Sequence, residues 1–327
     1  MEPAPTLQAL RDQTRTEPPA PLPTAPAAAA AAAPVAITEV PTGTWGNLRY
    51  AWTERELLKP MMARFLAKRI RGTKLGRLWL LIRPLMDALG KTLLFGGVLK
   101  LSSGSGTPYF LFILAGMLGW RLFDRSLMYG MRSVRLYRKL MRSFHFPLLF
   151  VAISSLAYPL VEAAVYMLVL FGTVIFFWAT TGHFYLSPPP RLLLFFPGFA
   201  LLLVLTMGAT LWLAIANAKW RDWRYALRYV LPIGLFVTPI LYPINKLPHQ
   251  WHWLAVVNPL TAPIEMIKFG LIGAGFIELR AVVVSVVVGG VITVSGLWYY
   301  TRDAARSLQF AGVGGGDDDD DDDDDGF

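Results

Sequence analysis

The sequence predicts an all-α integral membrane protein. The predicted architecture has six transmembrane helices, an N-terminal amphipathic helix at the membrane interface and two short re-entrant half-helices before the last span. Hydrophobic residues make up 54% of the chain and charged residues only 16%, whereas a soluble domain carries about a quarter charged residues. Apolar stretches of membrane-spanning length recur along the chain, and Lys and Arg gather in alternate connections between them. Both patterns are typical of multi-pass membrane proteins.

Composition divides the chain into four regions. Residues 1–42 are rich in Pro and Ala and lack the basic start and apolar core of a signal peptide, so we expect a disordered cytosolic extension there. Residues 43–76 form the predicted interface helix, and residues 77–306 form the six-span domain. Residues 307–327 contain a glycine run followed by nine aspartates, which predicts a solvated, self-repelling tail.

The predicted interface helix has two faces. Apolar side chains recur at helical spacing from Leu57 to Ile70, and the intervening face is basic. A helix of this kind lies in the cytoplasmic headgroup region, where membrane lipids are its partners.

Six apolar stretches follow, at residues 78–100, 108–131, 147–180, 191–217, 229–244 and 280–300. Each approaches or exceeds the length that crosses a hydrocarbon core of ~30 Å, and 229–244 is the short one. The stretch 147–180 is too long for one upright helix, so we expect it to tilt or to extend past the membrane. The basic segment 218–228 is predicted to be a loop, and the prolines after it are expected to interrupt regular helix in the fifth span.

The distribution of basic residues sets the orientation. The connections on one side hold twenty Lys and Arg, against five on the other side, which places both termini in the cytoplasm. A net charge of +9 would suggest nucleic acid if the chain were soluble. Here the basic residues flank apolar spans, so anionic lipid headgroups are the expected partners and nucleic acid is not.

An apolar segment at residues 251–275 does not fit a simple span. Pro259 and Pro263 break it, and its neighbours must both cross the membrane. We expect two short helices that dip into the membrane and return, a shape allowed only where protein or a cavity covers the backbone. The alternative is an ordinary outer loop with an interfacial helix.

Several chemistries have no support in the sequence. Cysteine is absent, which excludes disulfides, thiol nucleophiles and cysteine-based metal sites. His249 and His252 have no neighbouring carboxylate, so no metal site is predicted. The stretch GSGTP at 104–108 lacks the lysine of an ATP-binding loop, and energy for any transport must come from a partner or an ion gradient.

One face of the first span carries Arg83, Asp87 and Lys91 at spacings of four. Charges at mid-membrane each cost about 2.5–3.5 kcal/mol, although alternating signs at this spacing allow pairing along the helix. We interpret these residues as a hydrophilic stripe that faces a substrate path. In the alternative, Arg83 and Lys91 reach opposite membrane surfaces and Asp87 neutralises them.

Aromatic rings on the second span, among them Tyr109, Phe112 and Trp120, are candidates for flat surfaces on which a sugar could stack. The alternative role is interfacial anchoring and helix packing, which is the ordinary use of such rings in membranes.

Blocks of sequence in a fixed order resemble the ABC-2 type permeases that export polysaccharides. They are RIRGTKLGRLWLLIRPL (69–85), LFILAGMLGWRLF (111–123), LYRKLMRSFHFP (136–147), the stretch from 218 through LYP at 243, and NPLTAPIEMIKFGLIG (258–273). The stretch YYTRDAARS (299–307) is similar to the capsule-exporter branch. The likeness covers about residues 45–310. The chain departs from the common pattern at Arg83 and in both tails.

The resemblance implies a transport subunit of the bacterial inner membrane and not an enzyme. Such permeases pair with a second copy of themselves and recruit a cytoplasmic dimer of ATP-binding subunits, which holds ATP and Mg²⁺, so this chain is expected to bind no cofactor. The cargo is a lipid-linked glycan such as O-antigen or capsule, and in some systems export couples to a periplasmic or outer-membrane conduit. The half-helices that shape the exit correspond here to Asn258, Pro259, Pro263 and Glu265.

Basic cytoplasmic segments are the candidate docking surface for the ATP-binding partner. The candidate residues are Arg135, Arg138, Lys139, Arg142, Arg221, Asp222 and Arg224. In the alternative interpretation these residues only set the orientation in the membrane.

Two other functions remain open at this point. An exporter of the same family could carry a small hydrophobic molecule such as a drug. A membrane-embedded glycosyl- or acyltransferase would need a catalytic carboxylate at the membrane surface, and Asp124 and Asp222 are the only candidates near such a place.

Overall fold

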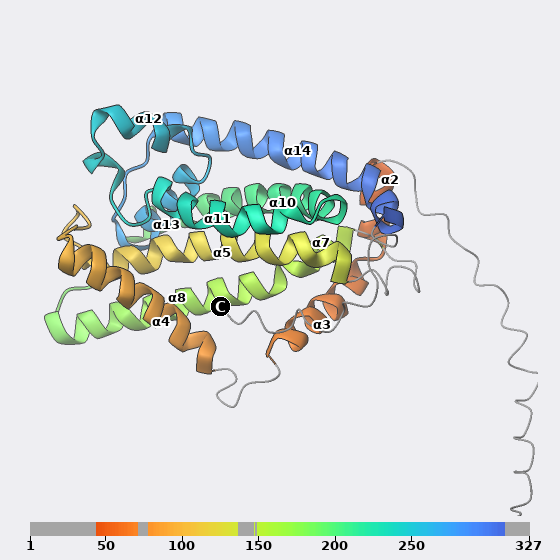
Figure 1. The fold of residues 1–327 in the computed structure, drawn as a ribbon. Helices are drawn as coiled ribbons and strands as arrows, with labels where there is room; N and C mark the ends of the chain where they lie inside the picture. Colours follow the sequence, from red (N-terminus) through yellow and green to blue (C-terminus); the bar gives the residue numbers. More distant parts are fainter. Residues whose placement is uncertain (1–43, 71–77, 137–146, 148, 311–327) are drawn as a thin grey trace, which may run out of the picture. The chain divides into compact units, whose positions relative to one another are not determined.

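The structure is a computed structural model that describes residues 44–70, 78–136, 147 and 149–310. The chain divides into two units, Met1–Glu39 and Val40–Phe327, and all of the described residues belong to the second. Within them the structure is helical and contains no strand (Figure 1). The predicted extension 1–42 and most of the tail 307–327 lie outside the described residues, and the last helix continues to Phe310.

The N-terminal segment forms two helices where we predicted one. α2 (Thr44–Thr53) and α3 (Leu58–Ile70) are separated by a 3₁₀ turn, η2 (Arg55–Leu57). Asn47 and Ala51 of α2 are buried, and the Thr44 and Thr301 hydroxyls lie 3.0 Å apart. α2 packs on α7 and α14, and α3 packs on α7 and α8. We call this end of the bundle the α2 end.

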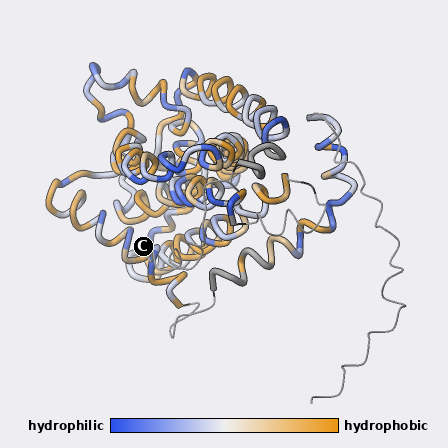
Figure 2. Tube along the Cα trace, turned by 45° about the vertical axis from the view of Figure 1, so that its right-hand side comes forward, coloured by the Kyte–Doolittle hydropathy of each residue, from blue (hydrophilic) through white to orange (hydrophobic). Residues whose placement is uncertain are grey.

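Two long helices form the centre of the bundle. α5 (Tyr109–Leu136) packs on α8, α10 and α13, and α10 (Phe195–Lys219) packs on α14, α5 and α13. α5 is buried on every side from Leu111 to Trp120. α10 and α14 (Leu279–Phe310) approach most closely at Gly208, where an added Cβ would lie 2.5 Å from Thr293 Cα. Figure 2 shows hydrophobic colour along most of α14.

The third apolar stretch divides into α7 (Leu149–Ser155) and α8 (Ala157–Thr181) at Leu156. α8 ends at Gly182, whose φ of +71° is the left-handed conformation that glycine adopts without strain at a helix end. A short helix, α9 (Pro189–Leu192), precedes α10. The first stretch is also composite, because α4 (Leu78–Lys91) continues into a π-helical segment, η3 (Thr92–Val98).

α11 (Asp222–Val237) begins within the segment 218–228, which we predicted to be a loop. That boundary was wrong for a physical reason. Asp222 lies in the first turn, where a negative charge complements the helix N-terminus, and Leu227 and Leu231 are buried four positions apart. Pro232 lies inside α11 without ending it, whereas Pro239 follows its end.

A bent helix pair follows the short turn η4 (Ile244–Lys246). α12 (His249–Val257) and α13 (Thr261–Ile272) meet at 95° across a short break. α13 is buried on all sides from Thr261 to Lys268, so protein covers this hairpin's second arm. We call the end that carries α12 and the connection 99–108 the α12 end (Figure 1).

Three segments of the described chain are long and apolar enough to cross a membrane: Leu149–Thr181, Pro189–Lys219 and Leu279–Asp303. The α12–α13 pair passes the same test as a unit, which makes up to four. The α4, α5 and α11 helices carry too many charges or are too short to pass it, so the six-span topology stays a prediction.

Candidate functional site

An ion network joins α4, α5 and α8, and Asp87 is its centre. Asp87 Oδ1 pairs with Lys91 one turn along α4. Asp87 Oδ2 accepts hydrogen bonds from the Arg121 guanidinium at 3.0 and 3.2 Å and from the Tyr166 hydroxyl at 3.1 Å. Both oxygens of the Asp87 carboxylate therefore have partners. Charge-assisted hydrogen bonds of this kind are stronger than hydrogen bonds between neutral groups.

The other end of the network is looser. Arg121 reaches Asp124 at 3.5 Å, and Arg125 Nε lies 4.0 Å from both Asp124 Oδ2 and Glu162 Oε2. Glu162 Oε2 is buried without a hydrogen-bond partner among the described residues. The gap to Arg125 is longer than a hydrogen bond and leaves room for a bridging water or a hydroxyl group.

Helical spacing assembles these groups. Asp87 and Lys91, and likewise Glu162 and Tyr166, are four residues apart, which places each pair on one helix face. On α5 the residues Arg121, Asp124 and Arg125 follow the same rule. The network is balanced, with three cations and three carboxylates, and its charged side chains are only 9–22% exposed.

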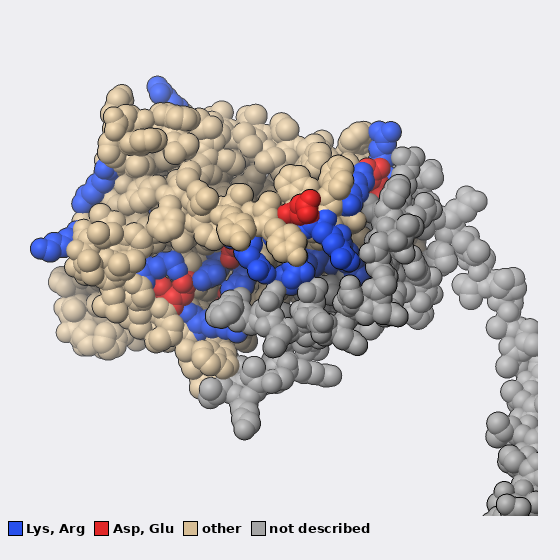
Figure 3. Space-filling view, viewed as in Figure 1, with Lys and Arg blue, Asp and Glu red and all other residues tan. Residues whose placement is uncertain are grey.

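Figure 3 shows a band of Lys, Arg, Asp and Glu across one face of the molecule, with mostly uncharged surface above it and a few further basic side chains at the top and left edge. Of the stripe predicted on the first span, the structure joins Asp87 to Lys91. Arg83 is exposed on α4 and makes no hydrogen bond or ion pair to a described residue. Sequence reasoning missed Arg121 and Tyr166 as partners. The signal was present, because Arg121, Asp124 and Arg125 are charges inside an apolar helix.

The three predicted aromatic residues lie in different places. Phe112 is fully buried and Trp120 is 4% exposed, so in this packing neither ring has an open face. The Tyr109 hydroxyl donates to Leu241 O at 2.5 Å. Tyr109 borders the connection 99–108 at the α12 end.

A second, separate ion pair lies within α13. Lys268 and Glu265 are 0% and 1% exposed and pair directly. The Lys268 ammonium also donates to Pro239 O at 2.6 Å and lies 4.2 Å from the centre of the Phe112 ring. The second Glu265 oxygen accepts the Phe276 N–H at 2.7 Å. The pair thereby connects α13 to the chain that follows α11, to α5 and to the bend before α14.

Hydrogen bonds also connect the corner between α12 and α13 to the chain that follows α11. Asn258 donates from Nδ2 to the Thr238 hydroxyl at 2.9 Å, while its Oδ1 accepts the Leu260 N–H at 3.0 Å. Pro259 lies in the break and Pro263 in the first turn of α13. Of the predicted exit residues, Asn258 holds the hairpin against Thr238, whereas Glu265 pairs with Lys268 and accepts the Phe276 N–H.

The candidate docking residues that the structure describes lie at the α2 end. Arg221 and Asp222 are exposed where α11 begins, and Arg224 follows in the first turns. Arg135 donates to Asn217 O at 2.7 Å, and the Asn217 amide donates to Met131 O at 2.8 Å, so α5 is tied to the end of α10. Arg138, Lys139 and Arg142 lie outside the described residues.

Several helices long and apolar enough to cross a membrane, packed around a balanced ion network, define the class of multi-pass membrane proteins, in which ionisable groups within the helices are functional-site candidates. Comparison with known proteins agrees with this class. Residues 56–272 match the ABC-2 type transporter family, and because the match spans more than half of the chain, the protein belongs to that family. It is a transport subunit.

Three relatives carry the same name, O-antigen export system permease protein RfbA. The chain is 29% identical to the protein from Myxococcus xanthus over 207 residues, which is 62% of this chain and 74% of the relative. It is 22% and 21% identical to two proteins from Klebsiella pneumoniae, over 78% of this chain and 94% of each relative.

Proposed function

We propose that this chain is the membrane permease of an ABC exporter that moves a lipid-linked polysaccharide across the bacterial inner membrane. The cargo class is O-antigen, capsule or a similar cell-surface glycan. The names of the relatives support this cargo, and the match over nearly the full length of the Klebsiella proteins supports a shared architecture.

The proposed topology has six spans with both termini in the cytoplasm. The spans are α4 with η3, α5, α7 with α8, α10, α11 and α14, and α12–α13 forms a re-entrant hairpin on the outer side. The alternation of these helices between the α2 end and the α12 end supports this arrangement (Figure 1). The twenty-to-five bias of Lys and Arg assigns the α2 end to the cytoplasm.

The ion network carries the proposal for a substrate path. Six charged groups and Tyr166 lie together between α4, α5 and α8. Pairing within the network offsets the cost of placing charges in the membrane. At its other end, Glu162 Oε2 has no hydrogen-bond partner among the described residues, and it can accept hydrogen bonds from the hydroxyls of a passing glycan.

The proposed assembly contains two copies of this chain and a dimer of cytoplasmic ATP-binding subunits. The partner subunits hold ATP and Mg²⁺, and this chain holds no cofactor. The exposed Arg221 and Asp222 at the start of α11 form the docking surface, together with the basic segment 132–146. An outer conduit is a further partner where export continues to the cell surface.

Depletion of this chain in its own cells tests the function. We expect a lipid-linked polymer to accumulate on the cytoplasmic side while surface glycan is lost, and the polymer then identifies the cargo. If the polymer is never made, the chain acts in synthesis. If surface glycan is unchanged while efflux of small hydrophobic molecules falls, the cargo is a small molecule.

A double variant tests the path. Asp87→Asn with Arg121→Gln removes two charges and keeps similar shapes. We expect export to fall about tenfold, the change produced by ~1.4 kcal/mol of lost stabilisation along the path, while the amount of protein in the membrane stays constant. Arg280→Gln, a change at an exposed cation at the start of α14 and outside the network, is the matched control and should export normally. Normal export by the double variant would show that the cargo does not use the network.

A further inference from the structure

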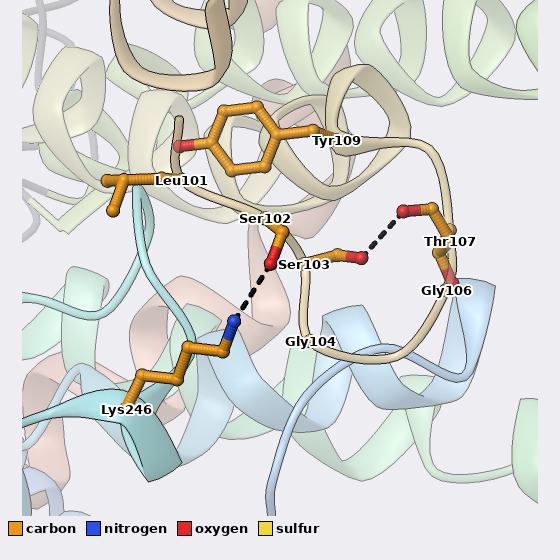
Figure 4. Close-up of a pocket in the computed structure, with 8 residues that line it drawn as sticks. All are labelled: Leu101, Ser102, Ser103, Gly104, Gly106, Thr107, Tyr109 and Lys246. Carbon is orange, nitrogen blue, oxygen red and sulfur yellow. Dashed lines mark hydrogen bonds between the residues drawn. The ribbon is translucent and has the colours of Figure 1, made fainter. Parts of the chain in front are cut away.

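The connection between η3 and α5 borders an open pocket at the α12 end, and most of the residues that line it are exposed. Its cavity volume is about 480 Å³, within the range of roughly 300–1,000 Å³ that small-molecule sites occupy. The lining residues are Leu101, Ser102, Ser103, Gly104, Gly106, Thr107, Tyr109 and Lys246. Figure 4 shows Lys246 extending from η4 toward Ser102, with the loop forming the opposite wall and the Tyr109 ring above it.

The conformation of the loop is set by its own hydrogen bonds and by glycine. The Ser103 hydroxyl donates to Thr107 O at 2.6 Å and closes the loop on itself. Gly104 and Gly106 have φ angles of +74° and +76°, which glycine adopts without strain. Within the described residues, no N–H group from Ser102 to Thr107 donates a hydrogen bond to another group of the protein. These donors remain available to a ligand or to water.

Lys246 supplies the cation that the GSGTP stretch lacks in sequence. Its ammonium donates to the Ser102 hydroxyl at 2.8 Å across 144 positions of sequence. A Cβ at Gly104 would lie 3.6 Å from Lys246 Cε, so turn and loop are in close contact. No carboxylate of the described residues forms an ion pair with Lys246. The pocket is thus positively charged without an internal counter-ion.

The chemistry of the lining selects one kind of ligand. An ammonium group and unused N–H donors favour an anion. Serine and threonine hydroxyls accept and donate hydrogen bonds, which suits neighbouring alcohol groups. The half-buried Tyr109 ring offers a flat apolar border of the kind against which sugar rings pack.

We propose that this pocket binds an anionic group carried on a polyol. Given the proposed function, the ligand is an acidic sugar residue, a uronate or a phosphosugar, of the exported glycan as it leaves the bundle. The phosphoglycerol headgroup of an outer-leaflet lipid has the same chemistry, and the experiment separates these two sources.

The first arm uses the purified full chain in nanodiscs of phosphatidylcholine, with trigalacturonate as the acidic probe and trigalactose as the neutral one. We expect saturable binding of trigalacturonate, measured by saturation-transfer NMR, and weak or no binding of trigalactose. Lys246→Met should weaken trigalacturonate binding about tenfold, which corresponds to the loss of ~1.4 kcal/mol. Lys100→Met, a change at an exposed lysine that does not line the pocket, is the matched control and should bind like the parent.

The second arm uses native mass spectrometry of the chain from nanodiscs that mix phosphatidylglycerol with phosphatidylcholine. Retention of phosphatidylglycerol that requires Lys246 and resists trigalacturonate assigns the pocket to the lipid headgroup. Displacement by trigalacturonate assigns it to the glycan. If neither ligand depends on Lys246, the proposal is overturned. Because both arms measure binding to purified protein, they give an answer whatever the depletion experiment shows about export.

Discussion

Removal of one member of the buried pair in α13 should destabilise the protein far more than removal of both. Lys268→Met keeps a long flexible side chain of similar size but leaves the Glu265 carboxylate, which is 1% exposed, with only the Phe276 N–H as a partner. Breaking a buried ion pair in this way costs about 3–5 kcal/mol. Glu265→Gln should cost less, because the Lys268 ammonium keeps its bond to Pro239 O and its contact with Phe112.

The double variant removes the uncompensated charge. The Gln at position 265 can still accept the Phe276 N–H, so the main remaining loss is the bond from Lys268 to Pro239 O. An unsatisfied buried carbonyl costs about 1–3 kcal/mol. The double variant should therefore be more stable than Lys268→Met alone, and the coupling free energy between the two sites should be at least ~2 kcal/mol.

The free energies of unfolding of these variants are measured by titrating the purified chain in mixed micelles with SDS. Circular dichroism monitors the unfolding. Arg280→Met, a change at an exposed cation at the start of α14, is the matched control and should change the free energy of unfolding by less than ~0.5 kcal/mol. If the effects of Lys268→Met and Glu265→Gln simply add in the double variant, the two groups do not depend on each other and the reasoning fails.

Three further changes test other parts of the structure. Gly208→Ala should destabilise the bundle by about 1–3 kcal/mol, because the new Cβ would lie 2.5 Å from Thr293 Cα. The control Gly290→Ala meets nothing within 4 Å and should be neutral or slightly stabilising. Equal effects of the two changes would contradict the close packing of α10 and α14. Tyr166→Phe should cost about 1.5–3 kcal/mol in the same titration, since it removes one hydrogen bond to the charged Asp87; an unchanged midpoint would mean that the bond contributes nothing. The chain has no cysteine, so single cysteines can be introduced and labelled with a membrane-impermeant maleimide. The reagent should label the Gln250→Cys variant in intact cells and the Glu56→Cys variant only after permeabilisation. The opposite pattern would invert the proposed topology.

The sequence predicted local features better than contacts between helices. The pair Asp87 and Lys91 follows from a spacing of four on one helix. The stretch 147–180 was expected to tilt or to extend past the membrane, and its division at Leu156 was not predicted. The partners Arg121 and Tyr166 come from two other helices, 34 and 79 positions away, and no periodicity relates them to Asp87. They could be found only after α4, α5 and α8 had been packed together.

Boundary errors had a common cause. The segment 218–228 was predicted to be a loop because it is basic and aromatic, yet Asp222 begins α11 there and Leu227 already faces the bundle. The high density of charge led to the wrong prediction, because an amphipathic helix at a membrane surface carries the same types of residue as a solvated loop. The rings of Phe112 and Trp120 are buried on α5, which agrees with the alternative role of helix packing.

The complete enclosure of α13 has a consequence for how the protein is made. Twelve residues span about 18 Å as a helix, less than the hydrocarbon thickness, and α13 carries two ionised groups that lipid would not accommodate. The translocon therefore cannot release it into the bilayer as an independent segment. We therefore expect α13 to enter its place only after α5 and α10, which are synthesised earlier and pack on it, have assembled. The helices of this chain thus assemble in an order that the sequence of spans alone does not impose. We expect α13 to enter its place near the end of assembly.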